Sequence, residues 1–192
     1  MKERPILFNG DMVRAILDGS KTQTRRIAKL TDSGRVKMPG RHFNWHCDDP
    51  NAWKASPYGT AGDRLWVRET HIAYEVGHIC YRADYKHDPK GEKEHGVTWT
   101  PSIHMPRWAS RITLEIIDVR VERLQNISPE DAVRDGARDT RPHDPLWDCA
   151  ALQNFRQIWE SCYGKESWSA NPLVWVVGFK RIDATEMREG KQ

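Results

Sequence analysis

The sequence predicts an α+β protein, a small mixed β-barrel with helices packed at its side. Three observations favour this class. Several short strand-like runs are separated along the chain, and few helical segments lie among them. One long alternating run, 111–124, changes the parity of its apolar residues in the middle, as a bent strand does. A C-terminal run, 171–182, is apolar enough to form a strand buried on both faces.

The first predicted elements are a strand at 5–8, "PILF", and a helix that follows it. Asn9 suits the N-cap of this helix, because its side chain can accept a hydrogen bond from the first turn. Gly19 suits the left-handed position that ends it. The apolar residues of the helix recur at helical period and form one stripe: Met12, Val13, Ile16 and Leu17.

The stretch "GDRLWVRET" predicts a second strand, which begins after a turn at 62–63. Side chains alternate across a strand, so Arg64, Trp66 and Arg68 would share one face. Glu69 would point to the opposite face, toward the inside of the barrel. A buried carboxylate there needs a cationic partner, and Lys21 and Arg26 are the candidates.

The later elements have clear sequence signals for their bends and ends. In 111–124, the parity switch at 116–117 predicts a bulge or a sharp bend. Ser128 and Pro129 begin a short helix that Gly136 ends. Gly164 ends a longer amphipathic helix, whose stripe is Leu152, Phe155, Ile158, Trp159 and Cys162.

We expect one domain over 1–182, with long insertions near 28–60 and 75–107 and a flexible tail at 183–192. The chain has 192 residues and a formal net charge of +3, with 19 Arg and 11 Lys. Arginine pairs with phosphate and stacks on bases, so a nucleic acid or nucleotide partner fits this composition.

The sequence predicts neither a membrane segment nor a signal peptide, and four sparse cysteines do not form a disulfide scaffold. A cytoplasmic protein is therefore expected. The histidines and cysteines at 42–47 and 78–80 do not have a recognised zinc spacing, so we expect no metal and no cofactor.

The polar stretch "GSKTQTRR", 19–26, follows the first helix. It either forms a solvated turn or brings Lys21 and Thr24 to a ligand. A threonine hydroxyl is a poor nucleophile unless a base takes its proton. A lysine that is partly desolvated beside other cations has a lowered pKa and can be that base. Arg25 and Arg26 supply such cations.

These residues resemble the GxKxxxxR signature of ASCH domains, the activating signal cointegrator homology family, at Gly19, Lys21 and Arg26. The chain looks like a longer prophage-type subgroup of that family. The resemblance rests on four stretches: "PILFNGDMVRAILDGSKTQTRR", "PYGTAGDRLWVRET", "HMPRWASRITLEI" and "NPLVWVVGFKRI". It implies a PUA-like β-barrel, RNA or a modified nucleoside as partner, and a relation to bacterial N(4)-acetylcytidine amidohydrolases.

By the same resemblance, Thr24 would be the nucleophile, Lys21 its proton acceptor and Asp135 the acid of the site. The family acid is commonly Glu, and Asp is one methylene shorter. Glu69 is the rival for that position. The insertions have no counterpart in the smallest enzymes of the family.

Two other functions stay open at this stage: an RNA-binding module without catalysis, and a ribonuclease that uses Lys with His or Tyr. For RNA, an aromatic flanked by cations offers stacking and phosphate contacts. The residues expected to bind substrate or RNA are Gly19, Arg25, Arg26, Arg64, Trp66, Arg68, His104 and Arg107.

Overall fold

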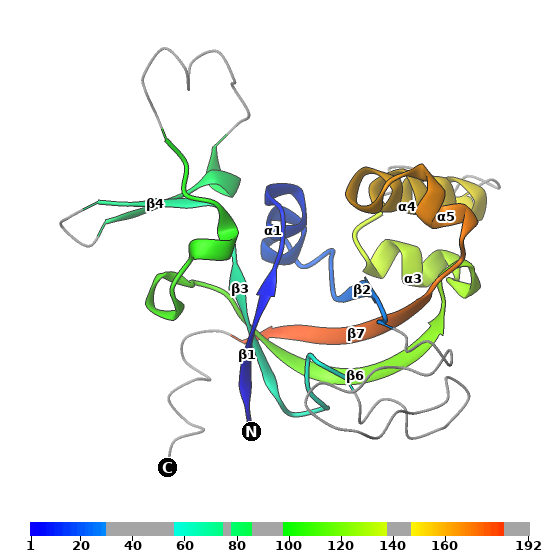
Figure 1. The fold of residues 1–192 in the computed structure, drawn as a ribbon, viewed down its shortest axis with the longest axis horizontal. Helices are drawn as coiled ribbons and strands as arrows, with labels where there is room; N and C mark the ends of the chain where they lie inside the picture. The colour runs from blue at the N-terminus through cyan, green and yellow to red at the C-terminus, as the bar shows by residue number, and fades with distance from the viewer. Residues whose placement is uncertain (30–55, 75–77, 86–97, 138–146, 183–192) are drawn as a thin grey trace.

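The computed structural model describes residues 1–29, 56–74, 78–85, 98–137 and 147–182. Its centre is a five-stranded sheet with the order β1-β3-β6-β7-β2 (Figure 1). The parallel pair β1 and β3 lies at one end, and the other pairs are antiparallel. The strands span Glu3–Leu7 (β1), Gln23–Ile27 (β2), Arg64–Arg68 (β3), Thr113–Arg123 (β6) and Leu173–Ile182 (β7).

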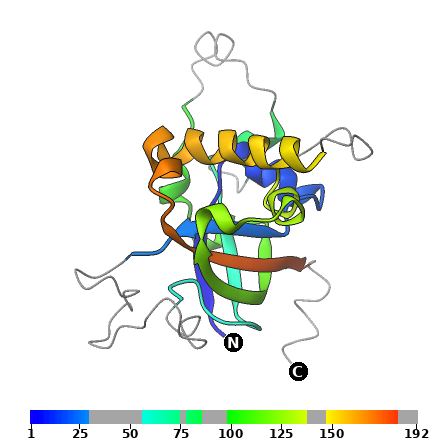
Figure 2. The same ribbon diagram turned by 90° about the vertical axis from the view of Figure 1, so that its right-hand side faces the viewer.

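Helices lie beside this sheet. The helix α1 (Gly10–Leu17) lies near the middle of the molecule, while α3 (Pro129–Arg134), α4 (Trp147–Tyr163) and α5 (Lys165–Ser169) gather on one side of it (Figure 1). Figure 2 shows α4 crossing above the sheet. A second sheet pairs β4 (His71–Ala73) with β5 (Ile79–Tyr81) on the other side of α1.

The predicted α+β class is confirmed, but the barrel is not closed. β1 and β2 are the two edges of the sheet, and within the described part of the chain neither pairs with a further strand. The predicted bulge is confirmed by a register shift between Ile116 and Asp118. The strand β2 was not predicted, because its sequence "QTRRI" has no apolar alternation.

The predicted helix signals are also confirmed. The Asn9 side chain accepts a hydrogen bond of 2.9 Å from the Met12 N–H. The Ser128 hydroxyl accepts one of 3.2 Å from the Asp131 N–H. Gly164 follows α4 directly, and its φ of +84° is a backbone conformation that favours glycine.

The two predicted insertions differ in what the structure describes. Most of 28–60, and the tail 183–192, lie outside the described residues. The insertion 75–107 contains β5 and a short 3-10 turn at 102–104, and Thr100 bridges to His71. The described part of this insertion is therefore built onto the β4–β5 sheet rather than structureless.

The two larger of three apolar clusters in the described residues lie on opposite faces of β7, which is buried along 173–179 as predicted. The first core joins α1 to the sheet, and its members include Phe8, Ile16, Leu65, Leu114, Val177 and Phe179. The second joins α3 and α4 to the sheet, and its members include Ala132, Phe155, Trp159, Val174 and Val176. Since β2 pairs with β7, Thr24 lies opposite Val177 and Arg25 opposite Val176. Neighbouring β2 side chains therefore point toward different cores.

Candidate functional site

The polar stretch 19–26 is a buried edge strand and its entry turn, not a solvated loop. Gly19 has a φ of +80° and ends α1, and the Lys21 N–H then donates to the carbonyl of Ala15 at 2.9 Å. Four of the polar residues that follow are buried: Lys21, Gln23, Thr24 and Arg25. Burial of so many polar groups requires partners from elsewhere in the chain.

Lys21 has its partner in Asp135, the residue directly after α3. The Lys21 ammonium donates to a carboxylate oxygen and to the backbone carbonyl of Asp135, both at 2.5 Å. The Lys21 side chain is fully buried and that of Asp135 is 7% exposed. Gly136, with a φ of +98°, makes the turn here, and a Cβ on it would lie 3.5 Å from Lys21 Cδ. The predicted pairing of Lys21 with Asp135 is thus present in the geometry.

The surroundings of Lys21 lower the pKa of its ammonium. Burial lowers the pKa of the ammonium, while the charge and hydrogen bond of Asp135 oppose that shift. The positive charges of Arg26 and Arg25 lower the pKa further, and the net direction is downward. A lysine with a lowered pKa gives up its proton more readily, and can then accept one from a nearby hydroxyl.

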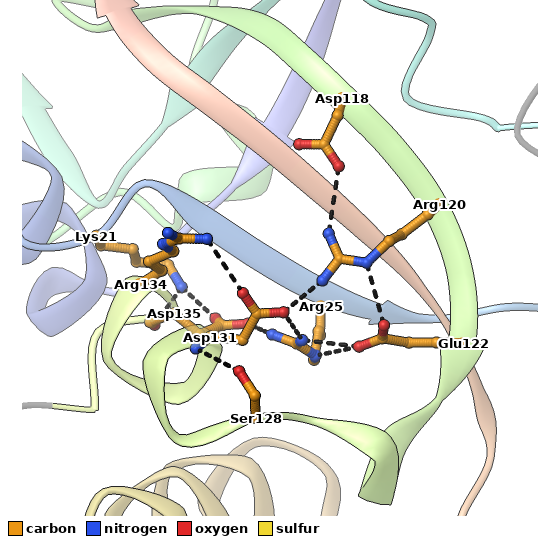
Figure 3. Close-up of polar contacts among 9 residues, drawn as sticks. All are labelled: Lys21, Arg25, Asp118, Arg120, Glu122, Ser128, Asp131, Arg134 and Asp135. Carbon is orange, nitrogen blue, oxygen red and sulfur yellow. Dashed lines mark hydrogen bonds and ion pairs between the residues drawn. The ribbon is translucent and has the colours of Figure 1, made fainter.

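Arg25 binds the other side of the same carboxylate (Figure 3). Its Nη1 donates to Asp135 Oδ2 at 3.1 Å, and its Nη2 donates to Glu122 at 2.7 Å and to Asp131 at 3.0 Å. The guanidinium also lies 5.7 Å from the centre of the Phe155 ring. Sequence analysis expected Arg25 to contact a ligand; in the structure three carboxylates occupy it instead, so its guanidinium is not free for phosphate.

Thr24 and Asp135 line a common cavity of about 30 Å³ between β2, α1 and α4. Aromatic residues of α4 close its other side: Phe155, Trp159 and Tyr163. A water molecule needs roughly 10–15 Å³ of such space, so this cavity admits water but not a nucleobase. Among the described residues, the Lys21 ammonium hydrogen-bonds to Asp135 and not to Thr24.

A larger groove of about 500 Å³ lies between α1 and α4. Ligand pockets commonly have about 300–1,000 Å³, so this groove has the size of a small-molecule site. Gly136, which packs on Lys21, forms part of its wall, and Ile158 lines both the groove and the small cavity. Ile158 therefore stands between the groove and Thr24.

The backbone of β2 adds polar groups at its free edge. The Thr22 carbonyl accepts a hydrogen bond from the Phe179 N–H, and the Ala28 N–H donates one to the Leu173 carbonyl. These two bonds show that the even-numbered residues of this stretch turn their backbone groups toward β7. In an antiparallel pair, alternate residues then turn both backbone groups away from the partner strand. The N–H and carbonyl of Arg25 are such groups, and they lie on the edge away from β7.

Glu69, the predicted rival acid, has Arg111 as its partner in place of the expected Lys21 or Arg26. Its carboxylate accepts hydrogen bonds from Arg111 Nε at 2.9 Å and Arg111 Nη2 at 3.0 Å. Arg111 also pairs with Asp84 and stacks on the Tyr81 ring at 3.9 Å. A partner 42 residues away in sequence satisfies the carboxylate, which was not identifiable from the strand pattern.

Arg26 spans the gap between the two sheet edges. Its Nη2 donates to the carbonyl of Leu7 in β1 at 2.5 Å, and its guanidinium lies 5.1 Å from the Phe8 ring centre. Arg26 therefore links β2 to β1 where the barrel is open. Among the described residues, the Leu7 carbonyl and the Phe8 ring are the contacts that the structure gives for the Arg26 guanidinium, which was expected to bind substrate or RNA.

The remaining predicted contacts form a separate cluster on β3 and the turns after it. The Trp66 ring centre lies 5.4 Å from the Arg68 guanidinium and 5.8 Å from that of Arg107. Arg68 donates to the carbonyl of Ile103, and Arg107 pairs with Glu3. None of the five predicted residues on this side lines the groove or the small cavity: Arg64, Trp66, Arg68, His104 and Arg107.

Sequence reasoning missed the part of α4 that covers β2. Phe155, Trp159 and Tyr163 recur at intervals of four residues, which the helical stripe signals, but this pattern equally predicts core packing. The residues that hold Arg25 were also missed. Glu122 lies 97 residues from Arg25 and Asp131 lies 106 residues from it, so no local pattern connects them.

The described residues hold no group of three or more His, Cys, Asp or Glu suited to a metal ion. Of the histidines and cysteines considered for zinc, those at 42–47 lie outside the described residues. No helix in the described ranges is long and apolar enough to cross a membrane.

Comparison with known proteins adds one structural likeness. No family model matches the chain, and no curated protein sequence matches it. The chain is similar to a crystal structure of an ASCH domain from Lactobacillus crispatus JV V101, with 11% sequence identity and a TM-score of 0.44. The likeness covers 94% of this chain and 79% of that one. A TM-score this low does not establish a common fold, so the family stays a resemblance of the sequence.

Proposed function

We propose that the protein binds a nucleobase, as a nucleoside or within RNA, beside Lys21, Thr24 and Asp135, and hydrolyses an acylated exocyclic amine of cytosine. One observation supports this more than any other. A fully buried lysine binds a buried aspartate at the wall of a cavity that a threonine also lines. Burying an ionisable lysine is costly, and such groups often mark functional sites.

The chemistry assigns one step to each residue. Neutral Lys21 accepts the hydroxyl proton of Thr24 as its Oγ1 bonds to the acyl carbon. The C–N bond then breaks, and the cytosine amine leaves with the proton that Lys21 returns. Water next attacks the acyl-threonine ester, and Lys21 takes a proton from that water. The bond between the acyl carbon and Thr24 Oγ1 then breaks, Lys21 returns the proton to Oγ1, and the carboxylic acid leaves. Asp135 holds the Lys21 amine in place through both halves.

This proposal requires two movements of the arrangement described above. The Lys21 nitrogen must also reach the Thr24 hydroxyl while it keeps its hydrogen bond to Asp135, a contact that catalytic groups often make only when substrate is bound. Side chains of α4 must also shift, since the cavity at Thr24 holds only about 30 Å³. Ile158 is the side chain whose movement would join the cavity to the groove, because it lines both.

The test is cytidine release from N(4)-acetylcytidine, followed by chromatography. Thr24→Ala should lower the rate at least ~100-fold, since it removes the nucleophile. Thr22→Ala is the matched control: Thr22 is exposed, two residues away, and holds its neighbours through backbone hydrogen bonds. It should keep the parent rate. Absence of cytidine with the parent protein would overturn the proposed hydrolysis.

RNA binding without catalysis is the second candidate, and the cluster around Trp66 favours it. Two guanidinium groups flank Trp66, and the neighbouring Trp108 is 69% exposed. Bases stack on exposed aromatics while arginines meet phosphates. If this candidate holds, affinity for single-stranded RNA falls steeply with salt, weakens in Trp108→Ala and is unchanged in Thr24→Ala. Cleavage of that RNA would instead support a ribonuclease.

A further inference from the structure

The carboxylate of Asp135 is shared between two buried cations. Lys21 donates to Oδ1 at 2.5 Å, and Arg25 donates to Oδ2 at 3.1 Å (Figure 3). Each oxygen thus has its own donor, and the plane of the carboxylate is fixed. A single-donor aspartate could rotate away from Lys21, whereas this one cannot without breaking the contact to Arg25.

Arg25 is itself held from several directions. Glu122 on β6 accepts from Nε at 3.2 Å and from Nη2 at 2.7 Å, and Asp131 on α3 accepts from Nη2 at 3.0 Å. The Phe155 ring on α4 lies under the guanidinium, and the Arg25 side chain is only 1% exposed. Three elements therefore lock one guanidinium fork, a geometry that lysine could not reproduce.

The charges of this network balance only when Lys21 carries its proton. The four cations are Lys21, Arg25, Arg120 and Arg134, and the four anions are Asp118, Glu122, Asp131 and Asp135 (Figure 3). They run from the fully buried Lys21 to Asp118, which is half exposed. Arg25 is the only one of the other three cations that contacts the Asp135 carboxylate among the described residues.

We infer that Arg25 is a positioning residue of the proposed site: it holds the Asp135 carboxylate against Lys21. Its charge also opposes protonation of Lys21, and it neutralises part of the carboxylate that favours protonation. Both effects lower the pKa of the Lys21 ammonium. Arg25 acts through Asp135 and Lys21 rather than on the reacting atoms.

Several other groups lie close to the Lys21 side chain and influence its pKa or its position. Asp135 approaches from the end of α3, and Arg25 and Arg26 approach from β2. The Phe8 ring, after β1, lies 5.9 Å from the ammonium, and the stem lies against Gly136. Arg26 is the second nearby cation, but it contacts the Leu7 carbonyl and not the carboxylate.

The test is a direct titration of Lys21 by NMR in the full-length protein with ¹³C-labelled lysine, with Lys21→Met to assign the signal. Arg25→Gln should move the Lys21 midpoint to higher pH. Arg120→Gln is the matched control, because it removes a cation that touches Asp131 and Glu122 but not Asp135. Its shift should be clearly smaller. Equal shifts in the two variants, or an unmoved midpoint in folded Arg25→Gln, would overturn the inference.

Arg25→Lys covers the case in which Arg25→Gln does not fold. It keeps one positive charge but cannot bridge three carboxylates, so the Lys21 midpoint should lie above that of the parent. A midpoint at or below the parent value would count against positioning by the fork.

The activity readout rests on the proposed function and is separate from the titration. If N(4)-acetylcytidine is hydrolysed, the acid limb of the pH–rate profile should move upward in Arg25→Gln, with a loss of about ten-fold or more near neutral pH. A rise in the Lys21 midpoint without any hydrolysis by the parent would keep the positioning inference and remove the hydrolase. Hydrolysis by the parent, together with an unmoved Lys21 midpoint in Arg25→Gln, would keep the hydrolase and overturn the positioning inference.

Discussion

Two buried carboxylates, Asp135 and Glu69, are the candidates that the sequence offers for the acid of the site, and the structure gives them different partners. Asp135 binds Lys21, a fully buried amine with a lowered pKa, and shares its second oxygen with Arg25. Glu69 binds Arg111 through two parallel hydrogen bonds. One pair contains a cation that can release its proton; the other contains a cation that cannot.

This difference favours a chemical role for the Asp135–Lys21 pair and a structural role for the Glu69–Arg111 pair. Arg111 also pairs with Asp84 and stacks on Tyr81, so it ties the end of β3 to the turn after β5 and to the start of β6. Burial raises the pKa of Glu69, and the hydrogen bonds and charge of Arg111 oppose that shift. Burial lowers the pKa of the Arg111 guanidinium, but its hydrogen bonds to Glu69 and Asp84 outweigh that effect and hold the pKa above the ordinary value. Arg111 therefore stays charged and cannot take the role that the account gives to Lys21.

The largest expected loss of stability comes from Asp135→Ala. It leaves the buried Lys21 without its acid and removes one of the three partners of Arg25. Breaking a buried pair from one side costs about 3–5 kcal/mol. Urea denaturation of the parent and the variant measures this change in the free energy of unfolding. A cost below that of Glu69→Gln would reverse the comparison.

Glu69→Gln should lower the free energy of unfolding by less, about 1–2 kcal/mol. Arg111 keeps its ion pair with Asp84, and the Arg111 side chain is 25% exposed to solvent. The amide still accepts a hydrogen bond from the fork. Thermal unfolding gives the stability change, and cytidine release should stay at the parent rate. Loss of activity in a folded Glu69→Gln protein would place Glu69 in the chemistry.

The pH dependence of stability distinguishes the two pairs through Lys21. Its pKa is lowered in the folded protein, so the unfolded chain binds more protons between that lowered value and about 10.4. The free energy of unfolding of the parent, relative to Lys21→Met, should therefore rise with pH across this window. Urea titrations at several alkaline pH values measure it, and parallel curves would contradict the lowered pKa.

The smallest effect is expected at the outer end of the Asp135 network. Arg134 is 64% exposed and approaches Asp131 at 3.5 Å, so Arg134→Ala should change the free energy of unfolding by less than about 0.5 kcal/mol. Thermal unfolding at low and high salt checks this. A change comparable with that of Asp135→Ala would show that the network acts as one unit.

The sequence predicted elements that carry local signals, and it missed those defined by distant partners. Asn9, Ser128 and Gly164 mark helix ends through their own backbone and side chains, and these predictions are confirmed. The strand β2 has no such signal, since its polar residues are buried only because α3, α4 and β6 surround them.

The site follows the same rule. Lys21 and Asp135 lie 114 residues apart, and their pairing was predicted through a family resemblance rather than through spacing. Glu69 was a reasonable rival on strand parity alone, but parity does not reveal that Arg111 lies opposite it. Arg25 was interpreted as a ligand contact because its three acceptors are distant in sequence.

The most direct measurement of this account compares the two acids in one assay: cytidine release from N(4)-acetylcytidine by the parent, Asp135→Asn and Glu69→Gln, each shown to be folded. The account predicts a loss of at least ~100-fold in Asp135→Asn, because the Lys21 amine is no longer held by a carboxylate, and a parent-like rate in Glu69→Gln. Equal losses in both variants, or a parent-like rate in Asp135→Asn, would contradict it.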